Sequence, residues 1–233
     1  MNDFTLRSNY KKPFTWSYSA LKNFETCPRK HYYYGVSKKI KEEKSAALTY
    51  GFEVHDAMAK RLKGEPLPSM IAPFEPWAVK FLSKQTPETR ILVEQDFGLD
   101  REFRPIGYWD KSVWYRAKGD AVRLQGQVAL YWDWKTGSVK EDAAQLLTAA
   151  CCIFAHYPQI MAVRGSFIWL DHGDAHSDLN LLRHEVPAAW ATIMPRVAPL
   201  EQAYMTDVWL PKPSGLCKRY CDVVSCEYHG VGG

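Results

Sequence analysis

Apolar residues recur at the spacing of a helix face in several parts of the chain. Leu21, Phe24 and Cys27 follow one another at three-residue intervals, and Ser17 stands where a helix N-cap is expected. Pro28 either interrupts this helix or begins a second one at its first position. The same reasoning predicts further helices at residues 46–63, 77–83, 142–155 and 187–207.

Short runs rich in apolar and β-branched residues predict strands between these helices. The strands are expected at residues 91–94, 113–124, 128–135, 164–170 and 179–186. Gln125-Gly126-Gln127 is the expected turn of a hairpin. Helices come first, then the hairpin, then strands alternating with helices, and this order predicts an α/β fold with a mixed sheet.

The composition allows a globular core and sets few limits on the partner. The chain has 233 residues, 46% of them hydrophobic, and a net charge of +4, which permits a nucleic-acid partner without requiring one. No apolar run is long enough to span a bilayer, and the N-terminus lacks a signal-peptide pattern. We therefore expect no membrane partner and a cytoplasmic protein, bacterial or, if phage-encoded, in the host cytoplasm.

An Asp-x-Lys triplet stands near the end of one predicted strand. Side chains two residues apart on a strand share a face, so Asp133 and Lys135 are on one face and Trp132 and Trp134 on the other. The tryptophans favour a core, which leaves the Asp–Lys face for a cleft, and Asp120 on the preceding strand is expected beside Asp133. Paired carboxylates favour a divalent cation such as Mg²⁺. The alternative is an ordinary solvated ion pair.

Three cysteines gather near the C-terminus in the pattern Cys217-x3-Cys221-x4-Cys226. Closely spaced thiols allow one ion or cluster to take several ligands from one loop. The best-placed fourth ligand is Cys27, which lies at the predicted helix break, and His229 competes for this role. In the cytoplasm, thiols or metal ligands are expected rather than disulfides.

Other candidate residues are ambiguous when taken alone. Cys151 and Cys152 lie in an apolar helix and are expected to be small core residues. His55 is a lone histidine on a predicted helix, and Gln145 stands near a helix start. Glu94 ends an apolar strand. A structural role is the simpler interpretation of His55, and a capping or surface role that of Gln145, while Glu94 alone indicates little.

The motifs together resemble a known group of enzymes. The segment from Ser17 to Pro28 resembles the opening of RecB-like and Cas4-like nucleases of the PD-(D/E)xK superfamily. The motifs that follow are in the family's order: Gly51-x3-His55, Glu94 on a strand, Gly119-Asp120, Asp133-Trp134-Lys135-Thr136-Gly137, and Gln145-Leu146. The three-cysteine tail is similar to that of the iron–sulfur branch. The resemblance extends to Cys226, almost the whole chain.

The resemblance implies a fold and a metal site. The fold would be a restriction-endonuclease-like core, a mixed central sheet flanked by helices, with an N-terminal helical segment and a C-terminal Cys-rich loop. His55, Asp120, Asp133 and the carbonyl of Trp134 would bind Mg²⁺ or Mn²⁺. Asp120 and Asp133 would also be catalytic, with Lys135 as the catalytic lysine and Gln145 as a supporting, DNA-contacting residue.

The resemblance also implies an iron–sulfur site, with two departures from the family pattern. Cys27, Cys217, Cys221 and Cys226 would hold a [4Fe–4S] cluster. The tail spacing differs from the commoner Cys-x2-Cys-x5-Cys, which keeps structural Zn²⁺ as an alternative. In addition, Ala149 stands where the family usually has a tyrosine four residues after the glutamine.

Three functions remain in competition at this point. The favoured one is a divalent-metal-dependent DNA nuclease, an exonuclease by preference, acting on single strands or duplex ends in replication, recombination or repair, with a replication or recombination protein as a further partner. The second is a catalytically weak or inactive DNA-binding subunit of the same fold. The third is a zinc-stabilised protein unrelated to nucleases. We expect residues 1–16 to be a flexible arm and 17–233 a single nuclease domain joined at the cluster.

Overall fold

The computed structural model divides into two compact units that we describe separately. The structure describes residues 13–41, 45–139, 142–173 and 176–231. One unit contains the middle of the chain, residues 44–190, and the other combines residues 1–43 with residues 191–233. The predicted arm falls largely at residues 1–12, outside the described residues.

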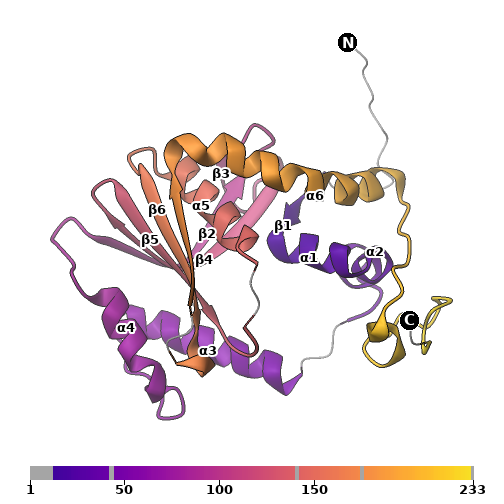
Figure 1. Cartoon of the computed structure of the whole chain (residues 1–233), viewed down its shortest axis with the longest axis horizontal. Coiled ribbons are helices and arrows are strands. Elements are labelled where there is room, and N and C mark those ends of the chain that lie inside the picture. The colour runs from indigo at the N-terminus through magenta and orange to yellow at the C-terminus, as the bar shows by residue number, and fades with distance from the viewer. Residues whose placement is uncertain (1–12, 42–44, 140–141, 174–175, 232–233) are drawn as a thin grey trace. The chain divides into compact units, whose positions relative to one another are not determined.

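A mixed sheet forms the centre of the middle unit (Figure 1). Its strands are ordered β3-β2-β4-β5-β6-β7. Their bounds are β2 (Arg90–Leu99), β3 (Pro105–Ile106), β4 (Tyr115–Gln125), β5 (Val128–Lys135), β6 (Ala162–Trp169) and β7 (His176–Leu182). The neighbours pair antiparallel, except that β5 and β6 are parallel.

The parallel pair requires a crossover, and helix α5 (Ala144–His156) supplies it. α5 carries almost only small and apolar residues, which pack against one face of the sheet. Its residue Leu146 lies beside Gly165 of β6, which also contacts Tyr131 of β5. Cys151 and Cys152 are buried in this helix, in agreement with their expected core role.

Helices α3 (Ala46–Leu62) and α4 (Glu75–Leu82) cover the opposite face of the sheet (Figure 1). A short 3-10 helix, η2 (Ala72–Phe74), precedes α4. Side chains from these helices form one hydrophobic core with Trp132 and Trp134 of β5. The two tryptophans therefore occupy the core that the sequence predicted for them.

Two short helices follow β6 and β7, the last two strands in the order of the sheet. They are η3 (Leu170–His172), which follows β6, and η4 (Arg183–Glu185), which follows β7. The guanidinium of Arg183 donates to the backbone carbonyls of Phe154, Tyr157 and Ile160. This side chain thereby satisfies carbonyl groups at and beyond the end of α5.

The other unit brings together the two ends of the chain. Its elements are β1 (Trp16–Ser17), α1 (Tyr18–Thr26), α2 (Pro28–His31), a π-helical turn η1 (Tyr32–Val36), and η5 (Gly215–Lys218). The long helix α6 (Val186–Thr206) begins in the middle unit and continues in this one. The carboxylate of Glu25 in α1 accepts two hydrogen bonds from Arg196 of α6.

Most expected elements are present, with bounds shifted by a few residues. Ser17 caps α1 as predicted, since its side chain accepts a hydrogen bond from the backbone of Ala20, and Pro28 begins a second helix. β2 is longer than expected because it continues beyond Glu94 to Leu99. No helix among the described residues is both long and apolar enough to cross a membrane.

Candidate active site

The carboxylate of Asp133 is buried on β5, where three side chains contact it. Its Oδ1 accepts hydrogen bonds from the hydroxyl of Tyr131 at 2.9 Å and from the amide of Gln145 at 2.8 Å. Its Oδ2 lies 2.5 Å from the ammonium group of Lys135, which also donates to Gln145 Oε1 at 3.1 Å. The alternation of β5 and the start of α5 thus bring the predicted residues Asp133, Lys135 and Gln145 into one hydrogen-bonded group.

Asp120 lies on β4, next to the end of the ladder that pairs this strand with β5. Its Oδ2 accepts a hydrogen bond from the backbone N–H of Trp134 at 2.9 Å and lies 3.3 Å from Nδ1 of His55 on α3. The two carboxylates, of Asp120 and Asp133, are close enough for the charge of one to raise the pKa of the other. The neighbouring position predicted for them is therefore present.

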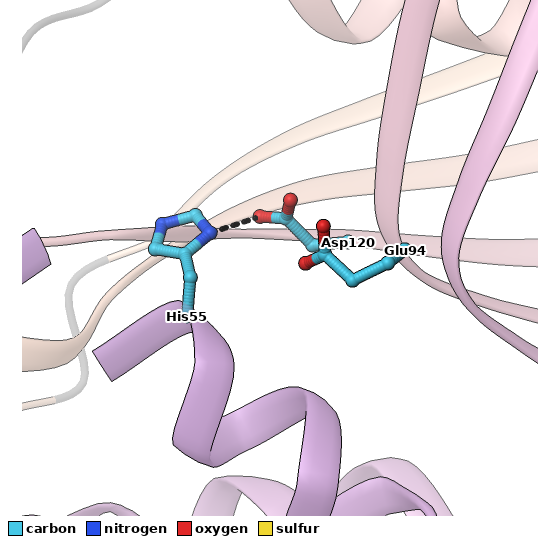
Figure 2. Close-up of side chains that lie close together, drawn as sticks. All are labelled: His55, Glu94 and Asp120. Carbon is cyan, nitrogen blue, oxygen red and sulfur yellow. Dashed lines mark ion pairs between the residues drawn. The ribbon is translucent and has the colours of Figure 1, made fainter. Parts of the chain in front are cut away.

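His55, Glu94 and Asp120 form a group with the geometry of a cation site. Figure 2 shows the three side chains converging from helix α3 and strands β2 and β4. Each offers one ligand atom, and these atoms lie within 4.8 Å of one another. Imidazole nitrogen and carboxylate oxygens can bind a divalent cation, Mn²⁺ readily and Mg²⁺ through the oxygens. The donor set therefore fits the divalent metal implied by the sequence.

The backbone at Glu94 is strained. Its φ angle is +53°, in the left-handed region that residues other than glycine rarely adopt. The ladder between β2 and β4 also lacks a pair at Glu94 and Asp120, although pairs form on both sides of this point. Local strain of this kind is common at functional sites, where surrounding structure holds it in place.

The pKa shifts of Asp133, Glu94 and His55 indicate that negative charge exceeds positive charge at this site. Burial, followed by the charge of Asp120, raises the pKa of both Asp133 and Glu94 above their usual values, although Lys135 partly offsets this at Asp133. Burial lowers the pKa of His55, but its hydrogen bond to Asp120 and the nearby charges outweigh burial, so the net shift is upward. Such a group favours a proton or a bound cation.

The close group of possible ligand atoms overlaps only in part with the predicted metal ligands. The structure brings His55 and Asp120 together as expected, but the third member of the close group is Glu94, while Asp133 bonds to its own neighbours. Asp133 Oδ2 is nevertheless buried, and apart from the Lys135 contact it has no hydrogen-bond partner among the residues that the structure describes. The sequence contained two signals for Glu94: it is an acidic residue where an apolar strand pattern stops, and it stands among the family's motifs in the expected order.

The four predicted cysteine ligands line one small cavity in the unit formed by the chain ends. Cys27 comes from the junction of α1 and α2, and Cys217, Cys221 and Cys226 come from the C-terminal loop. His229, the competing ligand, lines the same cavity. The four cysteines are half-buried, and none forms a disulfide among the described residues. Cys27 and Cys226 thus line one cavity although they are 199 positions apart in the sequence.

Two nitrogen donors approach sulfurs of this cavity. The backbone N–H of Lys212 donates to Cys27 Sγ at 3.4 Å, and Nη1 of Arg29 donates to Cys226 Sγ at 3.8 Å. Hydrogen bonds to thiolate sulfur stabilise its negative charge and tune the potential of iron–sulfur clusters. The surroundings therefore fit thiolate ligands of a bound metal or cluster.

Comparison with known proteins identifies the family. The family model described as the PD-(D/E)XK nuclease superfamily matches residues 15–226 of this chain. The chain therefore belongs to the PD-(D/E)XK nuclease superfamily, as the sequence motifs indicated. Among proteins with curated functions, none is similar enough in sequence to count as a relative.

Solved structures share the fold at low sequence identity. One is a protein from Eubacterium rectale provisionally named an exonuclease, with 12% identity, a TM-score of 0.53, and coverage of 87% of this chain and 85% of its own. Another is SSO0001, with 18% identity, a TM-score of 0.50, and coverage of 95% and 90%. The mixed sheet flanked by helices is consistent with the restriction-endonuclease-like fold predicted from the sequence.

Proposed function

We propose that this protein is a divalent-metal-dependent deoxyribonuclease that hydrolyses phosphodiester bonds. The observation that carries the proposal is the convergence of His55, Glu94 and Asp120 beside the Asp133–Lys135 pair. The first three residues offer cation ligands, and Lys135 offers a half-buried ammonium group. Phosphodiester hydrolysis needs both kinds of group, because negative charge develops on the phosphate in the transition state.

Each residue of the site has a proposed role. His55, Glu94 and Asp120 would hold Mg²⁺ or Mn²⁺, with Asp133 and the carbonyl of Trp134 as further ligands. The bound cation would supply a Lewis acid and an activated water. Lys135 places a positive charge beside the reacting phosphate, and Gln145 keeps the Lys135 and Asp133 side chains in position through its two hydrogen bonds.

The substrate and the process are narrower proposals. An exonuclease acting on DNA ends or single strands, in replication, recombination or repair, agrees with the name given to the structural neighbour from Eubacterium rectale. A replication or recombination protein would then be a natural partner. A [4Fe–4S] cluster on Cys27, Cys217, Cys221 and Cys226 would be a structural cofactor, and Zn²⁺ is the alternative at the same site.

The test is cleavage of end-labelled DNA in the presence of Mg²⁺, Mn²⁺ or EDTA. The wild-type protein is compared with Asp133→Asn, which keeps the size of the side chain but removes its charge. Asp56→Asn is the matched control, because Asp56 is an exposed carboxylate on α3, next to His55 in sequence and paired with Lys60. Single-stranded, blunt and single-strand-tailed duplexes are used in parallel.

We expect cleavage by the wild type and Asp56→Asn with either cation, none with EDTA, and none by Asp133→Asn. Stepwise shortening from an end would identify an exonuclease. Binding of DNA by the wild type without cleavage under any of these conditions would contradict the proposal and favour an inactive DNA-binding subunit instead.

A further inference from the structure

Two aromatic rings and an arginine form a cluster on the middle unit, outside the proposed metal site. The rings of Tyr108 and Trp109 lie 4.9 Å apart, and the guanidinium of Arg116 lies 5.3 Å and 5.1 Å from their respective centres. Trp109 remains 77% exposed although it takes part in these contacts. One large ring is therefore held in a defined place while much of its surface stays open to solvent.

The loop that carries the rings is braced by its backbone. It follows β3, which pairs with the end of β2, and at this point the carbonyl of Gly107 would lie only 2.8 Å from a side chain added at Gly98. Asp110 closes the next turn by accepting hydrogen bonds from the backbone and hydroxyl of Ser112. The rings are consequently presented by a packed turn.

The cluster is continuous with the metal site along β4. Arg116 and Lys118 are two residues apart on this strand and so share a face. The ammonium of Lys118 lies 3.6 Å from Asp96 and 4.0 Å from Glu94, a member of the cation group. Four residues of antiparallel strand separate Arg116 from Asp120, a distance of about 14 Å.

Arg116 is partly exposed, and its guanidinium lies against both rings. Its Nε is buried and has no hydrogen-bond partner within the described residues, so a ligand would be bound by the outer nitrogens of the guanidinium. A guanidinium can bind phosphate through several donors while it stacks on aromatic rings. Exposed aromatic rings stack on unpaired bases of any sequence, whereas the bases of a duplex already stack on one another. The combination therefore fits a single strand of nucleic acid better than a duplex.

We propose that Tyr108, Trp109 and Arg116 form a binding site, called the station below, for the single-stranded nucleic acid that enters the metal site. Trp109 stacks on a base, Arg116 contacts a phosphate, and Lys118 lies between this station and Glu94. Phosphates in one strand of a stacked helix are spaced at about 3.4 Å, so 14 Å corresponds to at most about four nucleotides, and to fewer in an extended strand. The proposal rests on the proposed nuclease function for the identity of the ligand.

Binding without cleavage tests the station independently of catalysis. A fluorescent oligothymidylate of 20 nucleotides is titrated in EDTA against the wild type, Trp109→Ala, Trp109→Phe and Arg116→Lys. Met70→Ala is the control, since Met70 is a side chain of similar exposure, 72%, in another loop. Thermal unfolding of each variant verifies that it is folded.

We expect Trp109→Ala to raise the Kd at least about fivefold, because each stacked base contributes roughly 1–3 kcal/mol. Trp109→Phe should recover much of the affinity, and Arg116→Lys should bind more weakly than the wild type because lysine keeps the charge but loses the planar stack. Met70→Ala should bind as the wild type does. Equal affinity of Trp109→Ala and the wild type would overturn the proposal.

Cleavage provides a second readout if the protein is a nuclease. The loss caused by Trp109→Ala should be larger for the 20-nucleotide substrate than for a dinucleotide, which is too short to extend from the metal site to the station. The Trp109→Ala substitution should also raise KM by a larger factor than it lowers kcat. If the wild type binds the oligonucleotide through Trp109 but cuts no substrate, the nuclease proposal fails and the station stands. Equal losses on both substrates would argue against the station.

Discussion

Lys135 illustrates how neighbouring side chains fix one reactive group. Its ammonium contacts Asp133 and Gln145 and lies 4.8 Å from the centre of the Phe167 ring. These three partners come from β5, α5 and β6. The position of the positive charge is therefore determined by the packing of three elements, and it is available beside the proposed cation site.

Lys135→Ala should abolish most DNA cleavage and leave binding nearly intact. Loss of a group that stabilises transition-state charge typically lowers the rate by a hundredfold or more. Single-turnover cleavage and DNA affinity should be measured together, with Lys60→Ala as control because Lys60 is an exposed lysine on α3. A Lys135→Ala variant that cuts at the wild-type rate would remove this lysine from the mechanism.

Glu94 combines a strained backbone with a proposed ligand role, and one substitution separates the two. Glu94→Gly relieves the left-handed conformation, which costs a residue with a side chain about 1–2 kcal/mol, and removes a half-buried carboxylate. We expect the melting temperature of the metal-free protein to stay the same or rise, while the affinity for Mn²⁺ falls at least tenfold.

Calorimetric titration with Mn²⁺ and thermal unfolding in EDTA provide the two measurements. Glu88→Gly serves as the matched control, since Glu88 is exposed and lies outside the group of ligands. Unchanged Mn²⁺ affinity in Glu94→Gly would exclude Glu94 from the metal site.

At the scale of elements, helix α2 depends on a buried histidine. The ring of His31 lies against Phe24 and Trp209, and ring atoms approach Gly35 so closely that a side chain there would meet them at 3.1 Å. Burial lowers the pKa of His31 to about 4. The neutral ring is therefore the form that fits this site.

This burial should make stability fall in acid. The unfolded chain binds a proton at His31 below a pKa of about 6.5, whereas the folded protein does so only near pH 4, so the contribution is complete above pH 6.5 and lost as the pH falls toward 4. The loss amounts to about 3 kcal/mol at most. His31→Phe should flatten the dependence of the free energy of unfolding on pH between these values.

Urea unfolding at several pH values between 4 and 7 measures this difference. Because only the slopes are compared, a constant change in stability caused by the larger ring does not affect the result. Equal slopes in His31→Phe and the wild type would show that other groups cause the acid sensitivity.

At the scale of the whole molecule, the cysteine site joins the two ends of the chain. Cys27 and Cys226 line one cavity although 199 positions separate them, and the entire middle unit lies between them in sequence. A metal or cluster shared by these residues would close a very long loop of the unfolded chain. Such a closure removes much of the entropy of the unfolded state.

If the four cysteines hold a metal or cluster as proposed, replacing any of them by serine should remove it and lower thermal stability. Cys27→Ser, Cys217→Ser, Cys221→Ser and Cys226→Ser are each expected to lose iron and the brown colour and to melt about 5 °C or more below the wild type. Cys151→Ser and Cys152→Ser are the controls for metal content, because these thiols are buried in α5.

Elemental analysis and absorption spectra of anaerobically purified protein provide the measurement. If the wild-type protein contains zinc and is colourless, the conclusion is that these cysteines bind a zinc ion and not an iron–sulfur cluster. Full iron retention in Cys27→Ser would show that the fourth ligand lies elsewhere, and His229 would be tested next because it lines the same cavity.

The sequence alone determined the order of the elements and the chemistry of most site residues. Ser17 and Pro28 define helix starts through local geometry, and the alternation in β5 assigns Asp133 and Lys135 to the face opposite the tryptophans. These features depend on residues close together in the chain. The cysteine spacing likewise predicts a shared ligand for the three thiols of the C-terminal loop.

Only the tertiary structure decided which distant residues meet. Glu94 in the cation group has a left-handed backbone at a point where β2 and β4 do not pair, and no periodic pattern in the sequence encodes that conformation. The cluster of Arg116 with Trp109 depends on how the loop after β3 folds back on its neighbours. Contacts of this kind result from the packing of whole elements, whereas a pattern in the sequence records only the preferences of each element by itself.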